Sequence, residues 1–302
     1  MKPSLSANFA GLLAGLAAAV GYGLVPLFTL HINGTAPVEA DRMGDVVILF
    51  YRFLFASAII GGIMLVRGQS FRISLKELGT LLLLAYLSDA SALFNIAGFQ
   101  YISSGAATTI RFFYPVFTTL IMLVFYKEPR RWSTIIAMLM AVVGVVVLSL
   151  KGDAHAEIEG IIFEILSAVC MAFYLVYVSR SRVKDMNGLK LTFYVLFIGA
   201  LIFGGRAFQE GSFEPITTPT QWYNLLLAAV ICTAATNLSL VFAVKKVGST
   251  VTAVLGALEP LTAVAVGAFC FAEDITLYTL LGIAIILPAV LIIIISQRKQ
   301  AT

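Results

Sequence analysis

Five ionisable residues lie inside long apolar stretches of this sequence, where a charge is costly. They are Arg52, Asp89, Arg111, Glu164 and Glu259. A charged side chain at the centre of a bilayer costs about 3 kcal/mol on insertion scales. Residues of opposite sign can neutralise one another or bind the charged groups of a solute, and carboxylates can also carry a proton. The chemistry therefore depends on which of these residues the helices bring together.

Glu259 lies nearest the middle of its apolar stretch. Its predicted helix face also carries Thr252, Gly256 and Thr262, which are polar or small and unsuited to lipid contact. The adjacent Pro260 frees a backbone carbonyl one turn earlier. We predict that this carboxylate binds a cationic group of a solute or exchanges a proton. The alternative is a hydrogen-bonded structural residue that locks two helices together.

Arg111 shares a predicted helix face with Tyr114 and Pro115. A guanidinium group suits a carboxylate or a phosphate, so we predict that Arg111 and Tyr114 anchor an anionic group of a solute. The rise of a helix places Arg52, Asp89 and Arg111 roughly 10 Å below the outer membrane face. The alternatives are therefore that Arg111 extends to that face or pairs permanently with Asp89.

The remaining candidates have less specific surroundings. Asp89 is a candidate solute ligand or proton carrier, and Arg52 is a structural or coupling charge that can pair with it. Glu164 lies roughly 7 Å below the outer face, which predicts an interfacial charge or a coupling charge that lines a cavity. Asn95 and Asn237 are predicted to line the same cavity, although interhelical hydrogen bonds are the commoner use of such residues.

The composition assigns the chain to a membrane. Of its 302 residues, 60% are hydrophobic and only 12% are charged, whereas soluble proteins contain about 25% charged residues. The net charge of +4 is consequently no sign of nucleic-acid binding, and the expected partners are the lipid bilayer and a small-molecule solute. The oligomeric state is left open.

Ten apolar runs have about the length that a membrane-spanning helix needs. They cover residues 9–30, 46–66, 78–100, 104–126, 132–150, 160–179, 191–208, 222–243, 249–271 and 275–296. The connections are short, so we predict an all-α integral membrane protein of ten transmembrane helices.

Lysine and arginine residues lie mainly on one side of this ten-helix arrangement. The largest groups fall at residues 67–76, 127–131 and 180–190, while the other side has only Arg42, Lys151 and Arg206. Cytoplasmic loops carry the excess of positive residues. We therefore predict a protein of the inner (plasma) membrane with both termini in the cytoplasm.

Two segments of the chain repeat one another at an offset of 145 residues. The matched positions are Ser104 with Ser249, Pro115 with Pro260, and Glu128 with Glu273. We infer two five-helix halves, residues 1–150 and 151–302. Because five is odd, the second half enters the membrane from the opposite side, as in the inverted-topology repeats of transporters. The two matched prolines and Pro26 are predicted to bend their helices.

The closing stretches "YPVFTTLIMLVFYKE" and "LEPLTAVAVGAFCFAE" of the fourth and ninth runs resemble the EamA-type exporters of the drug/metabolite transporter superfamily. The resemblance covers essentially the whole chain, although Tyr114 stands where the second half has Glu259. It implies a cavity between the halves, alternating access, and export of small metabolites, often amino acids.

The function predicted is a secondary transporter that exports amino-acid-like metabolites. No P-loop motif is present, so the substrate gradient or protons are the candidate driving forces, and no cofactor or metal is expected. The alternative solutes are nucleobases or nucleosides, organic cations and drugs. A remoter alternative is a non-transporting protein or an intramembrane enzyme, for which the sequence offers no "HExxH" or "GxSxG" motif.

Overall fold

The computed structural model of the chain describes residues 5–29, 31–33, 38–98, 101, 110–127, 132–148, 158–270 and 277–301. Within these ranges all regular structure is helical and there is no strand, which confirms the all-α prediction. A helix satisfies its own backbone hydrogen bonds, and an apolar chain in lipid requires this.

The helices follow the predicted apolar runs closely. In residues 1–150 they are α1 (Leu5–Gly23), α2 (Val25–Thr29), α3 (Asp45–Val66), α4 (Leu75–Gly98), α6 (Tyr114–Phe125) and α7 (Trp132–Leu148), with the short 3-10 turn η1 (Glu39–Asp41). In residues 151–302 they are α8 (Ile158–Arg180), α9 (Gly188–Gln209), α10 (Pro219–Leu227), the π-helical η2 (Ala228–Ala235), α11 (Thr236–Val247), α12 (Ser249–Leu255), α13 (Leu258–Cys270) and α14 (Leu277–Ala301).

Each of the ten predicted runs contains at least one of these helices. Among the described residues, 7 stretches are long and apolar enough to cross a membrane. The three other runs appear as the shorter apolar helices Tyr114–Phe125, Trp132–Gly144 and Leu280–Ile292. Ser104, Glu128, Lys151 and Glu273, on which part of the repeat and loop predictions rest, lie outside the described residues.

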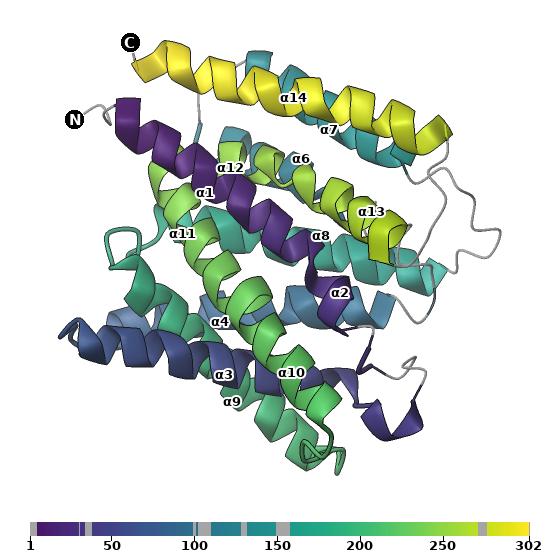
Figure 1. The fold of residues 1–302 in the computed structure, drawn as a ribbon. Coiled ribbons are helices and arrows are strands. Elements are labelled where there is room, and N and C mark those ends of the chain that lie inside the picture. The colour runs from purple at the N-terminus through teal and green to yellow at the C-terminus, as the bar shows by residue number, and fades with distance from the viewer. Residues whose placement is uncertain are drawn as a thin grey trace.

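Helices from the two halves of the sequence pack side by side (Figure 1). α7 lies along α14 at one edge of the molecule, and α3 lies along α9 at the opposite edge. Between these edges, α4 packs against α8 and α1 packs against α11. Each of these contacts joins a helix of residues 1–150 to a helix of residues 151–302, so the two segments form one bundle.

Glycines allow several of these helices to approach closely. A Cβ atom at Gly21 of α1 would lie 1.9 Å from Thr236 Oγ1 of α11. A Cβ atom at Gly144 of α7 would lie 2.6 Å from Ile286 Cγ1 of α14. Lipid offers apolar groups as favourable as those of a neighbouring helix, so close van der Waals packing through small residues is a main source of helix association in membranes.

Two serines join α4 to α8 by reciprocal hydrogen bonds. The Ser91 hydroxyl donates to the Ser167 carbonyl at 3.0 Å, and the Ser167 hydroxyl donates to the Ser91 carbonyl at 2.7 Å. Both side chains are buried. The two helices are thus held at one axial position relative to each other.

Three of the membrane segments are interrupted, and a proline follows each interruption. Pro26 is the second residue of α2, which follows the end of α1 directly. Pro115 is the second residue of α6, after a turn at residues 112–113, and Pro260 is the third residue of α13, after a turn at residues 256–257. A proline in the first turn of a helix removes no intrahelical hydrogen bond. The expected bends are therefore breaks at which a new helix begins.

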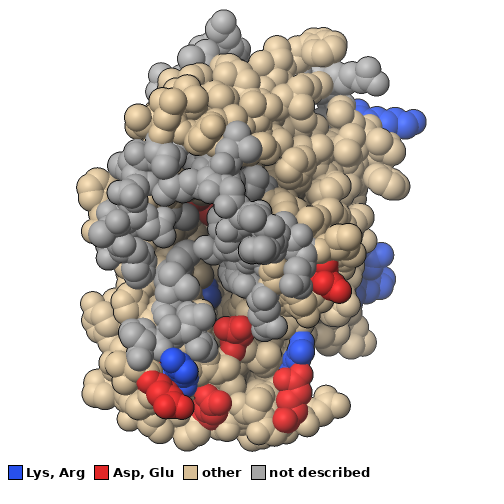
Figure 2. All heavy atoms as spheres, turned by 90° about the vertical axis from the view of Figure 1, so that its right-hand side faces the viewer, with Lys and Arg blue, Asp and Glu red and all other residues tan. Residues whose placement is uncertain are grey.

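The first described residues of α1 and the last residues of α14 lie at the same end of the bundle (Figure 1), as an even number of crossings requires. Figure 2 shows the opposite end. Acidic and basic side chains gather there on the lower part, while most of the other described surface in this view carries no charged residue. The assignment of these ends to the cytoplasm and the exterior stays a prediction.

The α7–α14 contact predicts an effect of Gly144→Ala on stability. The added methyl group would press on Ile286 and on the backbone of Gly282, and overpacking of this kind costs roughly 1–3 kcal/mol. We expect a lower temperature of unfolding for the purified protein in detergent, measured by loss of the monodisperse peak in size-exclusion chromatography. Gly62→Ala is the control, because nothing lies within 4 Å of its added Cβ atom. Equal stability of the two variants would contradict the contact.

Candidate functional site

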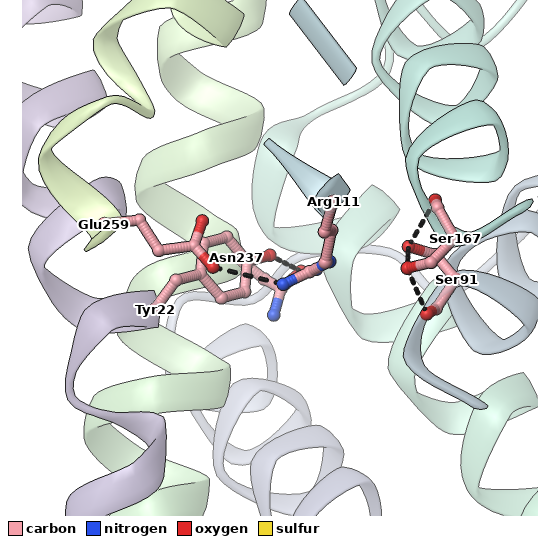
Figure 3. A network of polar contacts seen from close by, with 6 residues as sticks. All are labelled: Tyr22, Ser91, Arg111, Ser167, Asn237 and Glu259. Carbon is pink, nitrogen blue, oxygen red and sulfur yellow. Dashed lines mark hydrogen bonds and ion pairs between the residues drawn. The ribbon is translucent and has the colours of Figure 1, made fainter. Parts of the chain in front are cut away.

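Two of the helix breaks bring Arg111 and Glu259 together. Arg111 lies just before the break that precedes α6, and Glu259 lies just after the break that separates α12 from α13. The guanidinium Nη1 donates to the carboxylate Oε1 of Glu259 at 3.1 Å. In Figure 3 the Arg111 side chain points toward the carboxylate of Glu259. Among the described residues, Arg111 is thus paired with Glu259 and not with Asp89.

The pair is largely enclosed by protein. The side chains of Arg111 and Glu259 are 18% and 14% exposed. Two charges removed from water are tolerated when they neutralise each other, and the loss of one partner leaves a costly uncompensated charge. The contact uses one guanidinium nitrogen, while the buried Nε atom of Arg111 has no hydrogen-bond partner in the described part of the chain. The pair therefore leaves hydrogen-bonding capacity unused.

Tyr22 and Asn237 form a second polar contact beside the pair. The Tyr22 hydroxyl donates to Asn237 Oδ1 at 3.2 Å, and Asn237 Nδ2 donates to the Thr233 carbonyl at 2.8 Å. Figure 3 shows the Tyr22 side chain next to the ion pair. The close approach of α1 to α13 depends on Gly23, where a Cβ atom would lie 2.6 Å from the Glu259 carbonyl oxygen. The aromatic ring thus forms one wall beside the charges.

Tyr114 is buried at the start of α6. Its hydroxyl lies against Gly256 in the second break, where an added Cβ atom would be only 1.7 Å away. Its ring also meets Phe112 edge-on, with 5.7 Å between ring centroids. Tyr114 therefore connects the two breaks directly, next to the charges that flank them.

Arg52 has a neutral partner. From α3 its Nε and Nη2 atoms donate to Thr233 Oγ1 at 3.4 and 3.3 Å. The threonine hydroxyl donates in turn to the Ala228 carbonyl, five residues earlier, at 3.0 Å. This bond falls within the π-helical η2, a type of distortion that often occurs at functional sites. The expected pairing of Arg52 with Asp89 does not occur within the described residues.

Asp89 is 4% exposed on α4. Neither of its carboxylate oxygens has a hydrogen-bond partner among the described residues. A Cβ atom at Gly199 of α9 would lie 2.6 Å from Asp89 Oδ1 and 2.7 Å from the Phe53 ring. Asp89 thus occupies an apolar contact of α3, α4 and α9, apart from the ion pair.

Glu164 on α8 is 0% exposed, so it lies inside the protein and not at the lipid interface. A Cβ atom at Gly98 of α4 would lie 2.4 Å from its Oε1 atom. Asn95 is only partly buried on α4. Sequence reasoning did not identify the glycines opposite Glu164 and Asp89. A glycine within an apolar helix is the signal that marks such close approaches.

The described residues contain no group of three His, Cys, Asp or Glu side chains that could hold a metal ion. What the site presents is an ion pair and, beside it, a side-chain hydrogen bond between Tyr22 and Asn237. Broken helices around buried charges of both signs are the construction of a membrane transporter.

A profile of the EamA-like transporter family matches the chain twice, over residues 9–150 and 158–295. The chain belongs to the EamA-like transporter family, part of the drug/metabolite transporter superfamily. The family predicted from the closing motifs of the fourth and ninth runs is thereby confirmed.

Individual relatives are distant. An uncharacterized transporter of Archaeoglobus fulgidus is 26% identical over 160 residues, which cover 53% of this chain and 56% of that protein, so this match spans about half of each. A protein of Rickettsia bellii named S-adenosylmethionine uptake transporter is 25% identical over 93% of this chain and 94% of its own length. A solved crystal structure superposes with a TM-score of 0.79 over 99% of this chain and 100% of its own, at 16% identity, which shows a shared fold.

The buried pair predicts energetic coupling between Arg111 and Glu259. In a double-mutant cycle of Arg111→Gln and Glu259→Gln, residues in direct contact couple by about 0.5–3 kcal/mol. Each single variant should unfold at a lower temperature than the wild-type protein in detergent. We expect the fall in unfolding temperature of the double variant to be smaller than the sum of the two single falls. The exposed pair Arg206–Glu210, with 2.6 Å between Nε and Oε1, is the control and should couple by about 0.3–0.5 kcal/mol. Equal coupling in the two cycles would argue against the buried pair.

Proposed function

We propose that the chain is a secondary transporter of small amino-acid-like metabolites that carry both a carboxylate and an ammonium group. The observation that carries this proposal is the Arg111–Glu259 ion pair between two broken helices. In the proposed mechanism the solute separates the pair. Its carboxylate takes the guanidinium of Arg111, and its ammonium takes the carboxylate of Glu259.

When the solute replaces the ion pair, Arg111 and Glu259 each keep a partner of opposite charge. In the empty protein the two side chains neutralise one another, and in the loaded protein each meets an opposite charge of the solute. A solute with only one charged group would leave the other side chain buried and unpaired, at a cost of several kcal/mol. The pair therefore selects for solutes of both charges, and Tyr22 and Tyr114 supply apolar walls beside them.

The proposed division into two inverted halves, residues 1–150 and 151–302, rests on two observations. The family profile matches the chain twice, with a boundary near residue 150. The main helix contacts are also symmetric between the two proposed halves. α3 packs against α9, and α7 packs against α14, and each of these pairs joins helices that hold the same position in their halves. The α4–α8 contact corresponds in the same way to the α1–α11 contact. Inverted repeats support alternating access around a central site, with both termini proposed to be cytoplasmic.

S-Adenosylmethionine, the solute named for the Rickettsia bellii relative, has the required chemistry. It is an amino acid with a carboxylate and an ammonium group, and it carries a sulfonium and a nucleoside besides. It is accordingly a suitable probe. Export across the inner membrane, which the family resemblance implies, stays the predicted direction, and the name of this relative provides uptake as the alternative.

The charge arrangement also distinguishes the other solute classes. An organic cation would engage Glu259 and displace Arg111 without replacing its partner. A nucleobase would engage neither charge fully. We propose transport without catalysis, in keeping with the transporter family to which the chain belongs.

The transport test uses purified protein in liposomes loaded with unlabelled probe, with entry of the labelled probe by counterflow as the measurement. The probes are the L-amino acids and S-adenosylmethionine. We expect Arg111→Gln and Glu259→Gln to lower the initial rate about tenfold or more, because a hydrogen bond to a charged group contributes about 1.5–3 kcal/mol. The exposed variants Arg206→Gln and Glu210→Gln should transport at the wild-type rate.

Two outcomes would contradict the proposal. One is wild-type transport by both site variants when their folding is intact. The other is movement of permanent organic cations alone, because such solutes have no carboxylate for Arg111.

A further inference from the structure

We propose that Glu164 is a proton-binding site and the alternative partner of Arg111. In this inference, which rests on the proposed function, a proton on Glu164 leaves Arg111 free to bind the carboxylate of the solute. When Glu164 loses that proton to water, its carboxylate pairs with Arg111 and competes with the solute.

The first observation is the isolation of the Glu164 carboxyl group. Its side chain is 0% exposed, and both of its oxygens lack a hydrogen-bond partner within the described part of the chain. Gly98 of α4 approaches it so closely that a Cβ atom would lie 2.4 Å from Oε1. An ionised carboxylate without donors is strongly unfavourable in such a place, so the group is stable there only when it carries a proton or meets a cation.

The second observation is the unused capacity of Arg111. Its Nη1 atom donates to Glu259, while its buried Nε atom has no partner among the described residues. Glu164 interacts electrostatically with Arg111 and with Glu259. One cation therefore lies within range of two buried carboxylates. If both carboxylates were ionised, the three side chains together would carry one net negative charge. One proton on either carboxylate neutralises this charge.

The other titratable groups around α8 do not offer Glu164 a cation. The elements packed against α8 include α4, α6, α11 and α12. On α4 these groups are Lys76, Glu77, Tyr86 and Asp89, and Lys76 and Glu77 lie in the first turn, at the opposite end of the helix from Gly98. Tyr114 comes from α6, Lys245 and Lys246 lie in the last turn of α11, and α12 has no titratable residue. On α8 itself, Glu159 and Arg180 lie in the first and last turns, with Cys170, Tyr174 and Tyr177 between Glu164 and Arg180. Arg111 and Glu259 both act electrostatically on Glu164.

The consequence is linkage between proton and solute. Protonation of Glu164 releases Arg111, and so it favours binding of the solute carboxylate. By reciprocity, a bound solute favours protonation of Glu164. The proton and the solute therefore bind together, and the affinity for a zwitterionic solute falls as rising pH ionises Glu164.

The test is infrared difference spectroscopy of the reconstituted protein at neutral pH without any solute. A protonated carboxyl group has a C=O stretching band that is distinct from the bands of a carboxylate and that shifts in D₂O. We expect the wild-type protein to show such a band and Glu164→Gln to lose it. We also expect its loss in Glu259→Gln, because Arg111, deprived of its partner, then pairs with an ionised Glu164. The double variant Arg111→Gln/Glu259→Gln should regain the band.

The Asp89→Asn variant identifies the infrared band that belongs to the second buried carboxyl group, Asp89. Asp89 has no hydrogen-bond partner in the described part of the chain, and the ion pair of Arg111 is with Glu259, so the Asp89 band should be the same in Glu259→Gln as in the wild-type protein. The proposal is overturned if the wild-type minus Glu164→Gln spectrum contains carboxylate bands alone, or if Glu259→Gln retains the Glu164 band. If Glu164→Gln does not fold, the wild-type, Glu259→Gln and double-variant spectra decide the question without it. Because no solute is present, failure here is distinct from failure of transport.

Discussion

The arrangement of this protein depends on the cost of holding a charge away from water. Arg111 and Glu259 can lie deep in an apolar bundle because each neutralises the other. Their meeting requires two helix breaks, at residues 112–113 and 256–257, which place one charge before the first proline-started helix and the other within the second. In the proposed mechanism the same cost makes the pair selective, because a solute that separates the two charges has to provide a partner for each of them.

Glycine is the means by which the remaining helices reach the charged groups. At Gly23, α1 approaches the backbone of Glu259 closely. Gly256 leaves room for the hydroxyl of Tyr114, and Gly98 lies directly against Glu164. None of these contacts leaves room for a Cβ atom. Since lipid competes equally for apolar surface, close backbone approach determines which side chains surround the pair and how tightly.

The sequence predicted much of the fold but less of the site. Apolar runs of membrane length and the position of each proline can be read along the chain, so the ten segments and the family followed. Pairing cannot be read in this way. Depth estimates grouped Arg111 with Asp89 and Arg52, whereas the structure pairs Arg111 with Glu259 and gives Arg52 the hydroxyl of Thr233. Depth gives only the position of a residue along the membrane normal. Which helices are neighbours, and which way each one faces, is determined by tertiary packing.

The reciprocal hydrogen bonds of Ser91 and Ser167 bear on how the molecule moves. They fasten α4, from residues 1–150, to α8, from residues 151–302. The contact of Tyr22 with Asn237 likewise fastens α1 to α11. Sliding of one sequence half past the other would break both connections. The rigid bodies of a transport cycle are therefore expected to be composites, each assembled from helices of both halves, so the boundary between moving parts would not coincide with the boundary in the sequence.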